Sequence, residues 1–270
     1  MFGNRGIYHE GWTAVTRHSI PWDIASAPPN FDGDRWELYH VDRDFSQAED
    51  LAAKAPAKLA ELKAVFDREA LANNVFPLDA RRSERFDFRV AGRPDLMNGR
   101  RSLTVFPGMV GMPENAFINV KGEAHRITAD IDVPRGAPVE GVVIAQAGRF
   151  AGWTLFTANG RPSYEYNWFG LERTRLSAPD PLPPGRHVVE VEVTPESAKP
   201  GAPARAALRV NGQEVATALV PKTIPFAFSG DEGTDVGRDN ETPVSEAYRE
   251  GDNAFTGSIE KVTITLLPRP

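Results

Sequence analysis

Apolar and polar residues alternate with a period of two over much of the chain after residue 85. The alternation is most regular over residues 127–133, 189–193 and 259–267. Successive side chains of a β-strand point to opposite faces of a sheet, so this period predicts strands that bury one face. Further strands are expected at residues 86–90, 141–147, 153–157, 164–169, 206–210 and 215–220. The side chains expected to point inward are Phe88, Ile127, Ile131, Val189, Val191, Val193, Val262 and Ile264.

Two short dipeptides mark hairpin turns between these strands. Asn159-Gly160 and Asn211-Gly212 suit a type I′ turn, in which both central residues need a positive φ. Many short antiparallel strands joined by Gly and Pro turns are typical of a two-sheet sandwich. We therefore expect residues 85–270 to form a concanavalin-like jelly-roll β-sandwich.

The first 80 residues have a different pattern and predict a small α+β part. Residues 12–15 and 36–41 favour strands and are expected to pair. Leu59, Leu62, Phe66 and Ala70 recur at steps of three and four, which predicts a helix near residues 57–73 with Pro56 in its first turn. A capping box over residues 46–49 predicts that another helix starts there, ahead of the helix near residues 57–73. The chain as a whole is thus expected to be mainly β, with the helix packed on the strand pair outside the sandwich.

Composition and charge remove several classes of function. The 270 residues are 41% hydrophobic and 25% charged, which is ordinary for a soluble globular protein. A net charge of −6 argues against nucleic-acid binding, which needs a basic surface. No apolar run approaches the roughly 20 residues of a membrane span, and residues 1–10 lack the apolar core of a signal peptide. The cellular compartment is left open.

Catalytic motifs are missing from the sequence. The chain has no cysteine, so disulfides, cysteine-based metal sites and a cysteine nucleophile are excluded. The five histidines show no metal-binding spacing, and there is no G-x-S-x-G elbow or phosphate-binding glycine loop. We predict no catalytic residue and no cofactor in this chain.

A group of aromatic and arginine residues in one predicted hairpin is the first candidate site. Aromatic platforms flanked by arginine suit sugar or aryl ligands. The alternative is that these aromatic residues fill the core of the sandwich, where such residues lie more often. The candidate ligand-binding residues are Arg149, Trp153, Tyr164, Tyr166, Trp168 and Arg173.

An acidic, glycine-containing loop is the second candidate. Residues 230–252 hold eight acidic and two basic residues. Their net charge of −6 equals the net charge of the whole chain. Oxygen-rich loops can bind Ca²⁺, although the spacing is not that of an EF-hand. The alternative is a turn closed by hydrogen bonds to Asp side chains. The candidate metal-binding residues are Asp231, Glu232, Asp235 and Asp239.

Several motifs together resemble the C-terminal region of bacterial arylsulfatases. The first part carries R-x-I-x-x-G-x-W at residues 5–12, W-E-L-Y at residues 36–39 and an acidic turn before E-D-L-A at residues 49–52. The second part is similar to the β-sandwich tail of one arylsulfatase group. Its matching segments are residues 106–110, 148–153, 169–173, 235–237 and 242–245.

The resemblance implies sulfate-ester hydrolysis by an intact enzyme that uses formylglycine and Ca²⁺. This chain lacks the C/S-x-P-x-R motif, because Ser19, Ser26 and Ser177 are followed four residues later by Asp23, Asn30 and Pro181. The resemblance therefore implies a C-terminal portion that is structural or shapes the substrate site, and that is inactive without an N-terminal catalytic domain. Its expected partner is that catalytic domain or a second copy of the chain. The alternative is a free-standing β-sandwich module that binds a carbohydrate or an aryl ligand.

Overall fold

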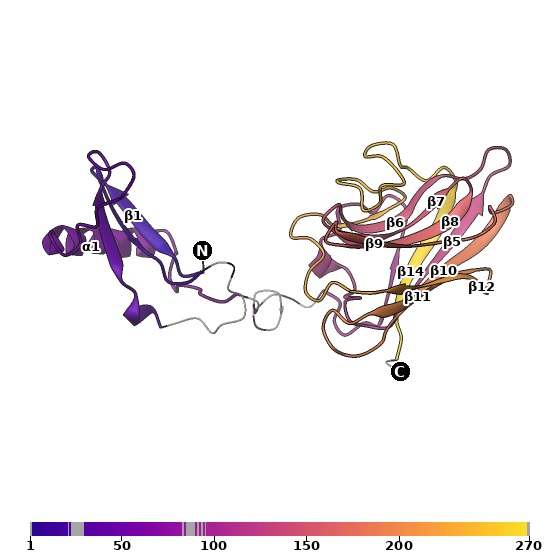
Figure 1. Cartoon of the computed structure of the whole chain (residues 1–270), viewed down its shortest axis with the longest axis horizontal. Helices are drawn as coiled ribbons and strands as arrows, with labels where there is room; N and C mark the ends of the chain where they lie inside the picture. The colour runs from indigo at the N-terminus through magenta and orange to yellow at the C-terminus, as the bar shows by residue number, and fades with distance from the viewer. Residues whose placement is uncertain are drawn as a thin grey trace. The chain divides into compact units, whose positions relative to one another are not determined.

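The structure is a computed structural model of the whole chain, and it divides into two compact units. The units are Met1–Pro94 and Asp95–Pro270 (Figure 1). The structure describes residues 2–20, 22, 30–82, 84, 90, 92, 94 and 96–268. No helix among the described residues is long and apolar enough to cross a membrane.

The first unit is a three-stranded antiparallel sheet with one α-helix packed on it, as far as the described residues show. The strands are β1 (Arg5–His9), β2 (Trp12–Thr16) and β3 (Trp36–His40), in the order β1-β2-β3. A 3₁₀ turn, η1 (Phe31–Gly33), precedes β3, and the helix is α1 (Pro56–Ala72). The expected pairing of residues 12–15 with 36–41 is confirmed, since Trp12 lies opposite His40 and Thr16 opposite Trp36.

The helical stripe is buried against the sheet. Leu62, Phe66 and Ala70 form one core with Ala14, Trp36 and Leu38. The ring of Phe66 contacts Trp36 edge to face at a centroid distance of 5.7 Å. Pro56 is the first residue of α1, where its missing N–H has no helical partner to lose.

The helix start predicted at residues 46–49 is wrong. Gln47 has a positive φ of 55°, which breaks a helix at that position. The carboxylate of Asp44, and not the Ser46 hydroxyl, accepts the backbone N–H of Glu49 at 2.9 Å. Asp44 also accepts the Ser46 hydroxyl at 2.9 Å. The capping residues therefore close a turn between β3 and α1.

The second unit is a β-sandwich of two antiparallel sheets, which confirms the predicted jelly-roll class. One sheet has the order β12-β11-β10-β5-β14-β4 and the other β13-β6-β7-β8-β9. Figure 1 shows these two layers stacked face to face. The strands of the first sheet are β4 (Ser102–Val105), β5 (His125–Val133), β10 (Gly185–Pro195), β11 (Ala204–Val210), β12 (Gln213–Val220) and β14 (Ser258–Leu266). Those of the second are β6 (Gly141–Gly148), β7 (Ala151–Ala158), β8 (Arg161–Trp168), β9 (Glu172–Ser177) and β13 (Thr234–Val236), and a 3₁₀ turn, η3 (Glu114–Ala116), precedes β5.

The inward positions expected from the period of two form the core. Ile127, Ile131, Val189, Val191, Val193, Val262 and Ile264 are all buried in one cluster between the sheets. Phe88 and the other residues of the expected strand at 86–89 lie outside the described residues. Both hairpin predictions are confirmed, because Asn159 and Gly160 have φ of 52° and 72°, and Asn211 and Gly212 have φ of 51° and 81°.

A long loop covers the outer face of the second sheet. We call residues 237–254, which follow β13, the cover loop. Val244 and Tyr248 of this loop pack on Val142, Ala145 and Phe156 in a small apolar cluster separate from the main core. Figure 1 shows the gold loops on the side of β6 and β7 that faces away from the other sheet. This face of the sandwich is therefore closed by the chain itself, except where the loop ends at the sheet margin.

Candidate functional site

Two hairpin turns lie next to each other at one end of the second sheet. The turn between β6 and β7 contains Arg149 and Phe150, and the turn between β8 and β9 contains Phe169 and Gly170. Because β6 to β9 are sequential antiparallel neighbours, alternate turns fall at the same end of the sheet. The cover loop reaches this end with residues 243–248.

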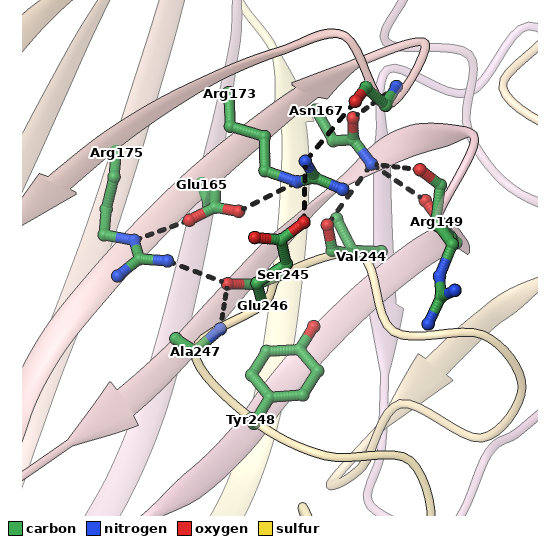
Figure 2. Close-up of polar contacts among 12 residues, drawn as sticks. Arg149, Glu165, Asn167, Arg173, Arg175, Val244, Ser245, Glu246, Ala247 and Tyr248 are labelled. Carbon is green, nitrogen blue, oxygen red and sulfur yellow. Dashed lines mark hydrogen bonds and ion pairs between the residues drawn. The ribbon is translucent and has the colours of Figure 1, made fainter.

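Asn167 holds these three segments together. Its side chain is fully buried, and its amide donates to the carbonyl oxygens of Gly148, Arg149 and Val244 at 3.2, 2.8 and 3.2 Å. Its carbonyl oxygen accepts the backbone N–H of Gly170 at 2.8 Å. One side chain thus fixes both turns and the cover loop, as Figure 2 shows.

A buried carboxylate lies beside Asn167 on the same face of β8. The Glu165 side chain is 1% exposed, and it accepts from Arg175 Nε at 2.5 Å. Arg175 also donates to Ser245 Oγ at 3.1 Å, and Ser245 Oγ accepts the N–H of Ala247 at 3.1 Å. A buried charge needs such a partner, so Arg175 is committed to neutralising Glu165 and anchoring the cover loop.

Arg173 lies two residues before Arg175 on β9, and the donors of its guanidinium are less fully satisfied than those of Arg175. Its Nε is 3.7 Å from the nearer oxygen of Glu165, which is an ion pair but not a hydrogen bond. This nitrogen is buried and has no hydrogen-bond partner among the described residues. Its Nη1 pairs with Glu246 Oε1 at 3.2 Å.

These elements surround a pocket of about 510 Å³. That volume falls in the usual range of small-ligand sites, roughly 300–1,000 Å³. The pocket combines two arginines, one glutamate, aromatic rings and small polar groups. Its lining residues are Arg149, Phe150, Phe169, Gly170, Arg173, Pro243, Ser245, Glu246 and Tyr248.

Two phenylalanine rings stand exposed at the edge of this pocket. Phe150 is 71% exposed and Phe169 is 46% exposed. Phe169 has a φ of 53° and Gly170 a φ of 68°, as in a type I′ turn. Asn would fit the first of these positions better than Phe, because a bulky residue is strained at positive φ. Phe169 is therefore an exposed ring kept at a strained backbone position.

The structure brings only part of the predicted aromatic group to the pocket. Arg149 and Arg173 line it. Trp153, Tyr164 and Tyr166 are instead buried between the sheets and cannot form an open platform. Trp168 is partly buried against that core, contacts Phe169 edge to face at 5.1 Å and lies under Lys222 Nζ at 4.4 Å.

The buried tyrosines differ in how their hydroxyl groups are satisfied. Tyr166 Oη accepts the N–H of Ile224 at 2.8 Å. Tyr164 Oη has no hydrogen-bond partner among the described residues. Burial raises the pKa of both phenols above the ordinary value, so both hydroxyls are neutral. Trp153 donates from Nε1 to Gln146 Oε1 at 2.8 Å inside the sandwich.

The carboxylates predicted to hold Ca²⁺ brace the loop with hydrogen bonds. Asp235 accepts the N–H groups of Gly111 and Asn240 at 2.6 and 2.8 Å. Glu232 accepts the hydroxyl and the N–H of Thr242. Asp231 accepts the Ser229 hydroxyl at 2.9 Å. In the part of the chain that the structure describes, no three acidic or histidine side chains are grouped closely enough to hold a metal ion.

Asp239, the fourth of these residues, lies in the cover loop and holds it together by hydrogen bonds within the loop. It is buried, and its Oδ2 accepts the Tyr248 hydroxyl at 2.6 Å and the N–H of Val244 at 2.9 Å. Burial raises the pKa of Asp239 to about 6, against the lowering effect of these two hydrogen bonds. Asn253 closes the other end of the loop by bonding the N–H and the carbonyl of Asp239, both at 2.9 Å.

Sequence reasoning missed Glu165, Asn167 and Arg175. The alternation Y-E-Y-N-W over residues 164–168 does place Glu165 and Asn167 on the face opposite the aromatics. A polar strand face normally meets solvent, and here the cover loop buries it. The exposed Phe169 beside Gly170 was the available signal for the site, because Phe is unusual in that turn position.

Comparisons with known proteins find similarity only at the level of structure. No protein-family model matches the chain, and no curated protein matches its sequence. The CBM40 of the Ruminococcus gnavus IT-sialidase, solved with α2,3 sialyllactose, is similar at 16% identity over 63% of this chain and 92% of that one, with a TM-score of 0.43. Mouse laminin α1 domains LG4-5 are similar at 17% identity over 64% of this chain and 41% of that one, with a TM-score of 0.38. The leech intramolecular trans-sialidase is similar at 14% identity over 63% of this chain and 26% of that one, with a TM-score of 0.40.

The assignment to the arylsulfatases is wrong. None of these similar solved structures is named as a sulfatase, and nothing in the comparisons points to that family. The motifs behind the resemblance have structural uses here. Gly11 takes a φ of 77° in the tight turn between β1 and β2, and Arg5 pairs with Asp34 at 2.6 Å. Trp36 fills the core of the first unit. The second unit of the chain is a β-sandwich, and the comparisons show nothing beyond this fold.

Proposed function

We propose that the chain is a non-catalytic carbohydrate-binding module, and that the pocket between the two hairpin turns and the cover loop is its binding site. The observation that carries this proposal is the exposed Phe169 ring, held at positive φ over a pocket that contains two arginines. The faces of sugar rings are apolar and their edges are rich in hydroxyls. Aromatic rings and guanidinium groups together match that chemistry.

The surroundings of the pocket support a binding role more than a catalytic one. Glu165 is a buried carboxylate 3.7 Å from the pocket residue Arg173, and its charge is already neutralised by Arg175 at 2.5 Å. Asn167 and Ser245 are used to hold backbone segments. A rigid scaffold with its outer groups exposed is suited to recognition of a ligand that arrives from solvent.

The test is to measure glycan binding by the full chain and by the variant Phe169→Asn. Asn suits the left-handed position beside Gly170, so the variant should fold while it loses the ring. We expect the affinity for glycans found by array screening to fall about tenfold, consistent with the loss of one aromatic contact of about 1.4 kcal/mol. Isothermal titration calorimetry is the measurement.

Phe226→Ala is the matched control, because Phe226 is 61% exposed and does not line the pocket. Its affinity should equal that of the wild type. If no glycan binds the wild type, or if Phe169→Asn binds as tightly as the wild type, the proposed function is wrong.

A further inference from the structure

The pocket already contains a carboxylate that the chain itself supplies. Glu246 Oε1 lies 3.2 Å from Arg173 Nη1, yet the Glu246 side chain is 80% exposed. Figure 2 shows it reaching from the cover loop to the arginine on β9. An exposed ion pair of this kind contributes little to stability, roughly 0–1 kcal/mol, so the carboxylate can leave at small cost.

The other charges of the pocket leave an excess of positive charge when Glu246 moves away. Glu165 and Arg175 cancel each other at 2.5 Å. Arg173 keeps a buried Nε with no hydrogen-bond partner among the described residues. The Arg149 guanidinium, in Figure 2, makes no interaction with the other residues drawn. Arg149 and Arg173 would then face the pocket, and Arg173 would keep Glu165 as its counter-ion, at 3.7 Å from Nε and shared with Arg175.

We infer that this site selects sugars that carry a carboxylate, and that Glu246 is an internal competitor which the sugar carboxylate displaces from Arg173. The inference rests on the proposed function. A guanidinium binds carboxylates in a planar, charge-assisted geometry that a hydroxyl cannot match. Glu246 shows that a carboxylate fits at this arginine. Arg149 can bind the second oxygen of the ligand carboxylate or a neighbouring sugar hydroxyl, while the Phe169 ring contacts the apolar face of the sugar ring.

The experiment compares carboxylated sugars with neutral partners on the full chain. The probes are sialyllactose with lactose, and tetragalacturonate with its methyl ester. We expect the wild type to bind the carboxylated member of each pair at least about tenfold more tightly. Glu246→Gln should strengthen binding of the carboxylated sugars about fivefold and leave the neutral sugars unchanged, because it removes the competitor. Arg173→Gln and Arg149→Gln should each weaken the carboxylated sugars about tenfold.

Two control variants separate this site from the general charge of the loop. Glu250→Gln removes an exposed acid from the same loop outside the pocket lining, and Arg161→Gln removes an exposed base at the opposite end of β8. Neither should change affinity by more than about twofold. Circular dichroism and thermal unfolding confirm that each variant is folded.

The outcomes separate the inference from the proposed function. Two results overturn the inference and leave the proposed function standing. In the first, the neutral and the carboxylated sugars bind equally well, and their binding depends on Phe169. In the second, Glu246→Gln does not strengthen the binding of the carboxylated sugars. A gain that Glu250→Gln reproduces also overturns it, because the effect is then general charge. Binding of no sugar at all by the wild type overturns both.

Discussion

At the scale of single residues, two buried tyrosine hydroxyls of β8 differ in whether they have a hydrogen-bond partner, and this difference affects the free energy of unfolding. Tyr164 and Tyr166 lie two positions apart on the same inner face of the sandwich. Both phenols remain neutral, because burial raises their pKa values. Tyr166 has a backbone donor from Ile224, whereas Tyr164 has no partner among the described residues.

The pair predicts opposite effects for the same substitution. Tyr164→Phe should raise the free energy of unfolding by about 1 kcal/mol, because it removes a buried polar group that is not hydrogen-bonded. Tyr166→Phe should lower it by about 1 kcal/mol, since the N–H of Ile224 then loses its acceptor. Equilibrium denaturation by urea, with the two variants measured side by side, checks both signs. A destabilised Tyr164→Phe would mean that the hydroxyl makes a contact in solution.

At the scale of elements, the strands were predictable and the cover loop was not. Alternation over residues 127–133 and 189–193 predicts which side chains are buried, because each strand has one face against the other sheet. The path of the cover loop depends on bonds between distant atoms, such as Asp239 to Val244 and Asn253 to Asp239. No periodicity in the sequence reports such bonds.

The anchor of the cover loop predicts a dependence of stability on pH. The pKa of Asp239 is about 6 in the folded chain against an ordinary value of 3.8, mainly because of burial. The native state therefore holds this proton more tightly, so the contribution to stability is full below about pH 4 and is lost as pH rises through about 6. Over that range the wild type should lose up to about 3 kcal/mol relative to Asp239→Asn.

Asn is a suitable replacement because its carbonyl oxygen can still accept from Tyr248 and from the N–H of Val244. The measurement is the free energy of unfolding of both proteins at several pH values between 4 and 7. Only the difference between the two curves reports on Asp239, since other groups titrate in both. Parallel curves would show that this carboxyl has an ordinary pKa in the folded chain.

At the scale of the whole molecule, sequence reasoning located the β-sandwich, and two of the six residues predicted to bind a ligand line the pocket. The alternation over residues 164–168 puts the aromatic side chains on one face and Glu165 and Asn167 on the other, but it does not show that a distant loop covers the polar face. Trp153 and Tyr164 proved to be core residues, and Arg149 and Arg173 are the members of the predicted group that reach the pocket. The ligand-facing rings come from the turns, whose position depends on the assembled sheet.

The main cores of the two units have no residue in common among the described residues. One joins α1 to β2 and β3 through Leu62 and its neighbours, and the other fills the sandwich. Among the described residues, those that line the pocket all belong to the second unit. Stability of the first core and binding at the pocket should therefore respond to different mutations.

Leu62→Ala is the variant that tests this division. Leu62 is fully buried, and its truncation should cost about 3 kcal/mol through lost transfer energy and a residual cavity. We expect hydrogen exchange to become faster in residues 5–16, 36–40 and 56–72 only, with sugar affinity unchanged. Leu208→Ala, at an equally buried position of β11, is the matched variant and should accelerate exchange within the sandwich instead. If Leu62→Ala also accelerates exchange in β6–β9 or weakens sugar binding, the two cores are energetically coupled, and the first unit has a part in forming the site.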